Sequence, residues 1–147
     1  MLFRSRGQRA NLHLIPEDLG KLKLVDVMAA NGAWDPTAQT VILAEGLLMY
    51  LPAEAVSDLF GQCAAITGTS SRMAFTYINR GGDGRPDIGR WTRLVQWILK
   101  VSGEPWLWSI RPGELGPFLD KNGWINAPDL VGASWQQGGE LFAVATR

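Results

Sequence analysis

The sequence predicts an α/β domain built on a mainly parallel sheet. Short apolar runs typical of strands alternate along the chain with amphipathic stretches typical of helices, which is the order of β–α–β units. The chain has 147 residues, of which 46% are hydrophobic and 19% are charged, a composition of globular rather than disordered proteins. A chain of this length hides roughly 70% of the surface that its unfolded form exposes, so it can build one core.

The first half of the chain supplies two strands and two helices in alternation. Residues 12–15 are a short apolar run stopped by Pro16, which predicts a buried strand, and residues 22–30 predict a helix. Residues 40–44 are apolar on both faces, as strands inside a parallel sheet are. Pro52 then opens a second helix with one apolar stripe. The stripe consists of Val56, Leu59, Phe60, Cys63 and Ile66.

The second half supplies the remaining elements. Residues 72–78 predict a third strand, and residues 91–99 repeat the helical apolar spacing after a glycine-rich loop. Residues 112–122 predict a further helix. Residues 124–125 and 140–146 predict two closing strands, and the last of these is apolar enough to lie inside the sheet.

Charge and cysteine usage exclude several classes of partner. Lys and Arg total 14 and Asp and Glu total 14, so the chain has no overall field that would hold nucleic acid or an anionic membrane. Residues 72–93 carry a local positive excess, which is either a solvated face or an attraction for an anionic substrate. The single cysteine, Cys63, excludes an internal disulfide framework and fits a reducing compartment, so we expect a cytoplasmic protein without a targeting segment.

Three residue types could carry chemistry but have simpler explanations. Cys63 lies on the apolar stripe, so a buried thiol is expected rather than a nucleophile. His13 is the only histidine and has no neighbouring His or Cys pair, so no metal site is predicted. The seven tryptophans either pack in the core or line an aromatic pocket for a flat organic ligand.

Acidic residues follow two of the predicted strands, where ligands of parallel sheets bind. Glu45 follows the strand at 40–44 and precedes Gly46, which lets the backbone approach a ligand closely. A carboxylate there is costly to bury unless it is paired, either with a cationic ligand such as a sulfonium or with an ordinary protein partner. Asp18, with the amide of Leu19, could bind the edge of an adenine or could cap a helix.

Residues 44–52 read AEGLLMYLP and residues 9–19 read RANLHLIPEDL. The first segment resembles the most distinctive motif of the leucine carboxyl methyltransferase-like family, and the second resembles that family's strand and turn on the adenine side. This family includes O-methyltransferases associated with polyketide biosynthesis. Further resemblances lie at residues 103–106, 113–115, 118–119, 123–124 and 142–147.

The resemblance implies an O-methyltransferase that uses S-adenosyl-L-methionine (SAM) and acts on a carboxylate or hydroxyl of a small molecule. It assigns three groups of residues: Asp18 and Leu19 to the adenine, Glu45 and Gly46 to the methionine portion near the sulfonium, and Met49 and Tyr50 to the region of the methyl acceptor.

The resemblance covers only the C-terminal half of the family's domain, so residues 1–147 would form the C-terminal part of a SAM-dependent methyltransferase domain. The family's sheet has the strand order 3-2-1-4-5-7-6, and its Gly-rich SAM turn and ribose-binding acidic residue have no counterpart in this chain. The predicted fold is therefore a partial Rossmann-like class I SAM-methyltransferase fold. It would have a mainly parallel sheet and a C-terminal antiparallel strand, and would lack the first two strands. Having lost its neighbours, the strand at 12–15 would either pair with the strand at 40–44 or be poorly ordered.

Two functional hypotheses follow. In the first, the chain is a truncated or split O-methyltransferase, completed by an N-terminal half or by a homo-oligomer. In the second, it is a non-enzymatic remnant that serves as a binding or dimerisation module.

Overall fold

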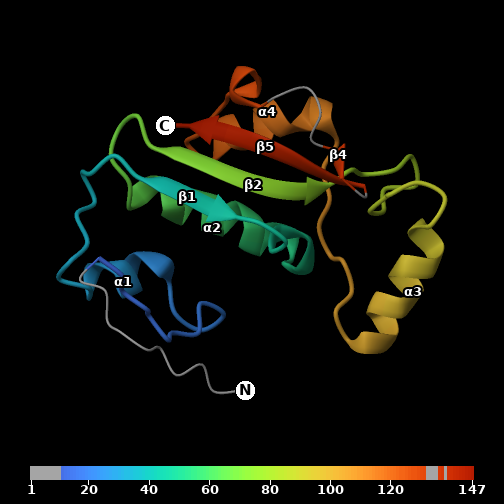
Figure 1. Cartoon of the computed structure of the whole chain (residues 1–147), viewed down its shortest axis with the longest axis horizontal. Coiled ribbons are helices and arrows are strands. Elements are labelled where there is room, and N and C mark those ends of the chain that lie inside the picture. The colour runs from blue at the N-terminus through green and yellow to red at the C-terminus, as the bar shows by residue number, and fades with distance from the viewer. Residues whose placement is uncertain (1–10, 132–135, 138) are drawn as a thin grey trace.

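The computed structural model describes residues 11–131, 136–137 and 139–147, drawn in colour in Figure 1. Arg9 and Ala10, which begin the segment 9–19, and Trp135, one of the seven tryptophans, lie outside the described residues. The sheet is built from β1 (Val41–Ala44), β2 (Arg72–Ile78), β5 (Glu140–Thr146) and β3 (Ile125–Asn126), in the spatial order β1-β2-β5-β3. The short β4 (Gln136–Gln137) pairs with β5 outside this order. β1 and β2 are parallel, whereas β5 is antiparallel to β2 and β3.

Four α-helices and two short 3-10 turns complete the described chain. They are α1 (Leu24–Ala29), η1 (Leu48–Tyr50), α2 (Ala53–Ala65), α3 (Thr92–Ser102), α4 (Pro112–Lys121) and η2 (Pro128–Leu130). α2 and α4 cover the same face of the sheet, and α3 projects away from the sheet beyond the end of β2 (Figure 1). No helix within the described ranges has the length and apolar content that crossing a bilayer requires.

Aromatic contacts between α2, α4 and the sheet form the centre of the core. The ring of Phe60 on α2 makes T-shaped contacts with Phe75 of β2, at 5.1 Å between centroids, and with Phe118 of α4, at 5.2 Å. Trp124, just before β3, is fully buried, and its indole N–H donates to the carbonyl oxygen of Phe60 at 3.0 Å. The core therefore joins residues that lie more than 60 positions apart in the sequence.

The predicted α/β fold class is confirmed. Helices and strands alternate from α1 to α3, and the order β1-β2-β5-β3 reproduces the 4-5-7-6 part of the order that the resemblance implies. The sheet is mixed rather than mainly parallel in its pairing, because only β1 and β2 pair in parallel and β5 is antiparallel to each of its partners. The C-terminal strand is antiparallel, as predicted. The apolar stripe of α2 is confirmed as core, because Val56, Phe60, Cys63 and Ile66 are buried.

The strand predicted at residues 12–15 is absent, so this prediction is wrong. The segment has no strand pairing and is exposed; Leu14, for example, is 72% exposed. Among the described residues β1 pairs only with β2, so its other edge offers its hydrogen bonds to no strand. An apolar run becomes a strand only where a neighbouring strand satisfies its backbone groups, and no strand of the described sheet lies beside residues 12–15.

β1 was expected to be buried on both faces, and this too is wrong. Val41 is 73% and Leu43 is 66% exposed, whereas Ala44 packs in the core formed with α2. One face of β1 is therefore covered and the other is not.

α3 forms as predicted, but it contributes no buried residue to the core. Its apolar side chains at Leu94, Trp97, Ile98 and Val101 are at least half exposed. The helical spacing thus identified the helix correctly, although nothing described in the chain covers its apolar face.

The thiol of Cys63 lies in the core, and we expect it to resist alkylation in the folded protein. Burial raises the pKa of this thiol from 9.0 to about 11. At pH 8 its reactive thiolate should therefore be about a hundredfold scarcer than in the unfolded chain. Labelling with iodoacetamide, followed by mass spectrometry, should be slow in buffer and fast in guanidinium chloride. Equal rates in both solvents would show that Cys63 is accessible.

Candidate functional site

The loop that follows β1 begins at the edge of the sheet where β1 and β2 both end. Glu45 comes directly after β1, and its exposed carboxylate makes no hydrogen bond or ion pair with any described residue. No ordinary protein partner, such as an arginine or a helix N-terminus, pairs with this carboxylate in the described part of the chain. Because the Glu45 side chain is exposed, the protein does not incur the free-energy cost of burying its carboxylate. The negative charge remains available to a cation in solution.

Gly46 fixes the direction of this loop. Its φ is 64°, a left-handed conformation that favours glycine. Its backbone N–H donates to the side-chain oxygen of Thr76 on β2 at 2.8 Å. A Cβ at this position would meet open space, so the glycine is required by the backbone conformation, and the space beside it is free for a ligand.

The two residues assigned to the acceptor region follow on η1. Met49 is buried, and its carbonyl oxygen accepts hydrogen bonds from the backbone N–H groups of Leu107, at 2.7 Å, and Trp108, at 3.2 Å. Tyr50 is 38% exposed and lines a cavity of about 550 Å³. The segment between α3 and α4 is therefore tied to the loop that carries Glu45.

Asp18 and Leu19 lie on an exposed turn before α1. One carboxylate oxygen of Asp18 accepts the backbone N–H of Gly20 at 2.9 Å, and the other lies 3.1 Å from the Lys21 ammonium. α1 is preceded by Lys23, without a side-chain cap. Asp18 therefore stabilises a turn and does not cap the helix, which removes the simpler of its two explanations.

The candidate residues form two groups in the structure. Glu45, Gly46, Met49 and Tyr50 share the loop from the end of β1 through η1. Asp18 and Leu19 lie on the turn before α1 and line neither the cavity at Tyr50 nor the cavity of about 560 Å³ between residues 14–17 and α1. The adenine and methionine assignments thus fall on separate segments that no described cavity joins, and their roles stay predictions.

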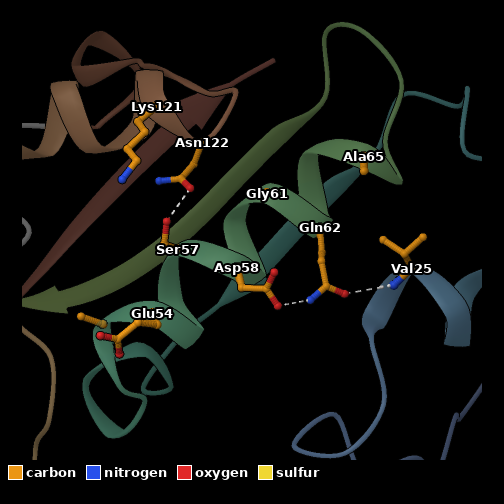
Figure 2. Close-up of a pocket in the computed structure, with 10 residues that line it drawn as sticks. Val25, Glu54, Ser57, Asp58, Gly61, Gln62, Ala65, Lys121 and Asn122 are labelled. Carbon is orange, nitrogen blue, oxygen red and sulfur yellow. Dashed lines mark hydrogen bonds between the residues drawn. The ribbon is translucent and has the colours of Figure 1, made fainter.

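A larger cleft of about 720 Å³ runs along the outer side of α2, between α1 and α4 (Figure 2). Four of its polar side chains already take part in hydrogen bonds within the chain. The hydroxyl of Ser57 donates to Asn122 at 2.8 Å, and the side chain of Gln62 links Asp58 to the backbone N–H of Val25. These bonds hold α1 and α4 to α2, and none of the six candidate residues lines the cleft.

The positive excess predicted at residues 72–93 is partly neutralised within the fold. Arg80 pairs with Glu114 of α4 at 2.9 Å and donates to the carbonyl oxygen of Ser109. Elsewhere in the described ranges, no group of three or more His, Cys, Asp or Glu side chains could hold a metal ion.

Sequence reasoning missed the wall opposite Tyr50. Glu104 and Leu107 line the same cavity as Tyr50. Residues 103–106 were noted for their family resemblance, but no local pattern gave Glu104 a role. The pairing of residues 50 and 104 depends on the return of the chain from α3, which no sequence spacing reports.

Structural comparison supports the fold. The chain resembles the pyocyanin biosynthetic protein PhzM with a TM-score of 0.51 and 16% identity, over 78% of this chain and 32% of that one. It resembles TnmH with the same TM-score and 15% identity, over 84% of this chain and 39% of that one. At such identities the likeness concerns the fold alone.

Sequence comparison concerns a shorter part of the chain. A protein of Frankia alni, named as a SAM-dependent methyltransferase, is 37% identical over 76 residues, which are 50% of this chain and 27% of the relative. A protein of Streptomyces avermitilis with the same kind of name is 36% identical over the same shares. The chain thus spans about a quarter of the length of these relatives. Residues 4–64 match the model of the leucine carboxyl methyltransferase family, so the family resemblance drawn from residues 9–19 and 44–52 is confirmed.

Proposed function

We propose that this chain is the C-terminal part of a SAM-dependent O-methyltransferase domain that acts on a small molecule. The observation that carries the proposal is Glu45, whose carboxylate has no partner among the described residues, at the carboxyl end of β1 and inside the segment that matches the family model. The names of the relatives support SAM as the cofactor.

The residues present fit part of a SAM site. The free carboxylate of Glu45 and the open space at Gly46 would receive the methionine portion, and Asp18 with Leu19 would contact the adenine. When bound, SAM supplies a methyl group activated by the positive charge of its sulfonium. The chain's contribution is to attract that charge and to orient an acceptor oxygen beside Tyr50.

Replacing Glu45 with glutamine is expected to weaken binding of SAM more than binding of S-adenosylhomocysteine. The first ligand carries a sulfonium charge and the second a neutral thioether. An exposed pair of charges contributes up to about 1 kcal/mol. In isothermal titration, Glu45→Gln should therefore raise the Kd for SAM about two- to fivefold over that of the unmodified chain. The Kd for S-adenosylhomocysteine should change by less than about twofold.

The matched control is Glu54→Gln, which removes an exposed carboxylate from the first turn of α2, where it lines the cleft along α2 and not the cavity at Tyr50. It should leave both Kd values unchanged. Equal weakening of the two ligands by Glu45→Gln, or no weakening of either, would contradict the sulfonium role of Glu45.

We also propose that a further segment completes this domain. The uncovered face of β1 at Val41 and Leu43, together with its unpaired edge, supports this. An N-terminal half of the domain, rather than a second copy of this chain, would supply the SAM turn that has no counterpart in the sequence.

The proposed protein would work in the cytoplasm, without nucleic acid or membrane partners, and a polyketide-derived acceptor is compatible with the family resemblance. The uncovered face of β1 also suits the second hypothesis, a binding or dimerisation module, which predicts that neither ligand binds.

A further inference from the structure

The cavity at Tyr50 is built from two segments that are far apart in the sequence. Its walls are Tyr50 on one side and Gly103, Glu104, Pro105 and Leu107 on the other, and its volume is about 550 Å³. Figure 1 shows the second segment returning from α3 towards the sheet, where it meets the loop after β1.

Backbone hydrogen bonds fix the wall that carries Glu104. Gly103 ends α3 with a φ of 82°, and the N–H of Glu104 donates to the carbonyl oxygen of Leu99 at 2.9 Å. Further along, the carbonyl oxygen of Met49 accepts the N–H groups of Leu107 and Trp108. Glu104 therefore lies between two anchored points, and Pro105 restricts the backbone directly after it.

Among the described residues that line the cavity, Glu104 is the only acidic or basic one. Its side chain is exposed, and its carboxylate makes no ion pair or hydrogen bond within the described ranges. Tyr50, Pro105 and Leu107 supply an aromatic ring and apolar surface. An ionised carboxylate accepts hydrogen bonds and donates none, so it favours a hydroxyl group and disfavours a second carboxylate.

Building on the proposed methyl transfer, we propose that this cavity binds the methyl acceptor and that Glu104 selects a hydroxyl group on an apolar or aromatic compound over a carboxylate. The cavity contacts the loop that carries Glu45 through Tyr50 at the end of η1, although Glu45 and Gly46 are not among its described lining residues. The acceptor hydroxyl donates to the Glu104 carboxylate while the apolar walls hold its ring. A carboxylate acceptor would instead place two negative charges side by side.

Two probes of the same shape separate these cases at pH 7: 2-naphthol, which is neutral, and 2-naphthoate, which is ionised. Each is titrated into the ¹⁵N-labelled 147-residue chain and followed by NMR. The expected reporters are the amides of Gly103, Glu104 and Leu107, and the buried indole N–H of Trp106, which has no acceptor in the described structure. The naphthol should bind about three- to fivefold more tightly, from the repulsion of like charges near water.

Glu104→Gln should abolish this preference by strengthening binding of the naphthoate, whereas the control Glu54→Gln should retain it. Equal or tighter binding of the naphthoate by the unmodified chain would overturn the proposal. Absence of binding by both probes, or an unchanged preference in Glu104→Gln, would overturn it as well.

A parallel titration with SAM, followed at the amide of Gly46, tests the proposed function separately. Binding of SAM with no preference between the probes would overturn the selectivity of Glu104 alone. A naphthol preference without binding of SAM would leave a site for hydroxylated aromatic compounds and would contradict the cofactor site in this chain.

Discussion

Replacing Trp124 with alanine is expected to lower the free energy of unfolding by about 3–5 kcal/mol. The side chain is fully buried, and its indole N–H bonds the carbonyl oxygen of Phe60. The substitution leaves a cavity between α2 and the sheet and removes a buried hydrogen bond to the Phe60 carbonyl oxygen, which keeps the helical hydrogen bond from the Ala64 N–H. Such a loss is a large fraction of the 5–15 kcal/mol (roughly) that stabilises a typical domain. Urea unfolding monitored by circular dichroism should show a much lower midpoint with an unchanged slope.

Trp124→Phe separates the two contributions. It keeps much of the apolar volume and removes the N–H, so it should cost about 1–2 kcal/mol, from the lost hydrogen bond and the smaller ring. If the alanine variant were no less stable than the phenylalanine variant, Trp124 would not be packed as the structure describes.

Sequence patterns correctly predict the elements whose apolar residues are covered by another described element. The stripe of α2 from Val56 to Ile66 has helical spacing, and the described sheet covers it. β2 and β5 are continuous apolar runs, and each has a partner strand on both sides. In these cases the local preference and the surroundings agree, so the pattern alone was sufficient.

The expectations that proved wrong concern segments that no described part of the chain covers. Leu14 was placed in a strand and Leu43 in a two-sided interior, yet both are exposed. Apolar composition indicates that a residue will be buried in something, but not which segment will cover it. Trp97 and Val101 on α3 make the same point, because their spacing identifies an apolar face that nothing described covers.

The candidate site was only partly accessible to sequence reasoning. Glu45 and Gly46 could be found because a polar residue after an apolar strand marks the carboxyl edge of a sheet. Glu104 could not be found in this way, since its place opposite Tyr50 follows from the hydrogen bonds that Met49 accepts from a distant segment. Tyr50 and Glu104 lie close together only because of how the chain folds, so no local sequence pattern predicts their contact with one cavity.

Gly68→Ala is expected to destabilise the protein by about 3 kcal/mol, at the upper end of what overpacking usually costs. Gly68 follows α2 and packs against the segment that leads into β1. A Cβ at this position would overlap the carbonyl oxygen of Thr37 and would lie 3.0 Å from that of Ala38. The obstacle is backbone, which cannot rotate aside as a side chain could. To remove this overlap, the two segments would have to separate. They are joined by a hydrogen bond of 3.1 Å from the Gly68 N–H to the Ala38 carbonyl oxygen.

Gly61→Ala, the matched control, should change stability in the opposite direction. Gly61 lies in the interior of α2, where a Cβ would have no atom within 4 Å. Alanine restricts the unfolded chain and favours the helix, so the variant should be more stable by about 0.5–1 kcal/mol. Thermal unfolding of both variants beside the unmodified chain should give one lower and one higher midpoint. If Gly68→Ala were instead as stable as the unmodified chain, the close approach of the segment before β1 to the end of α2 would be wrong. The position of β1 relative to α2, and with it the placement of Glu45, would then need revision.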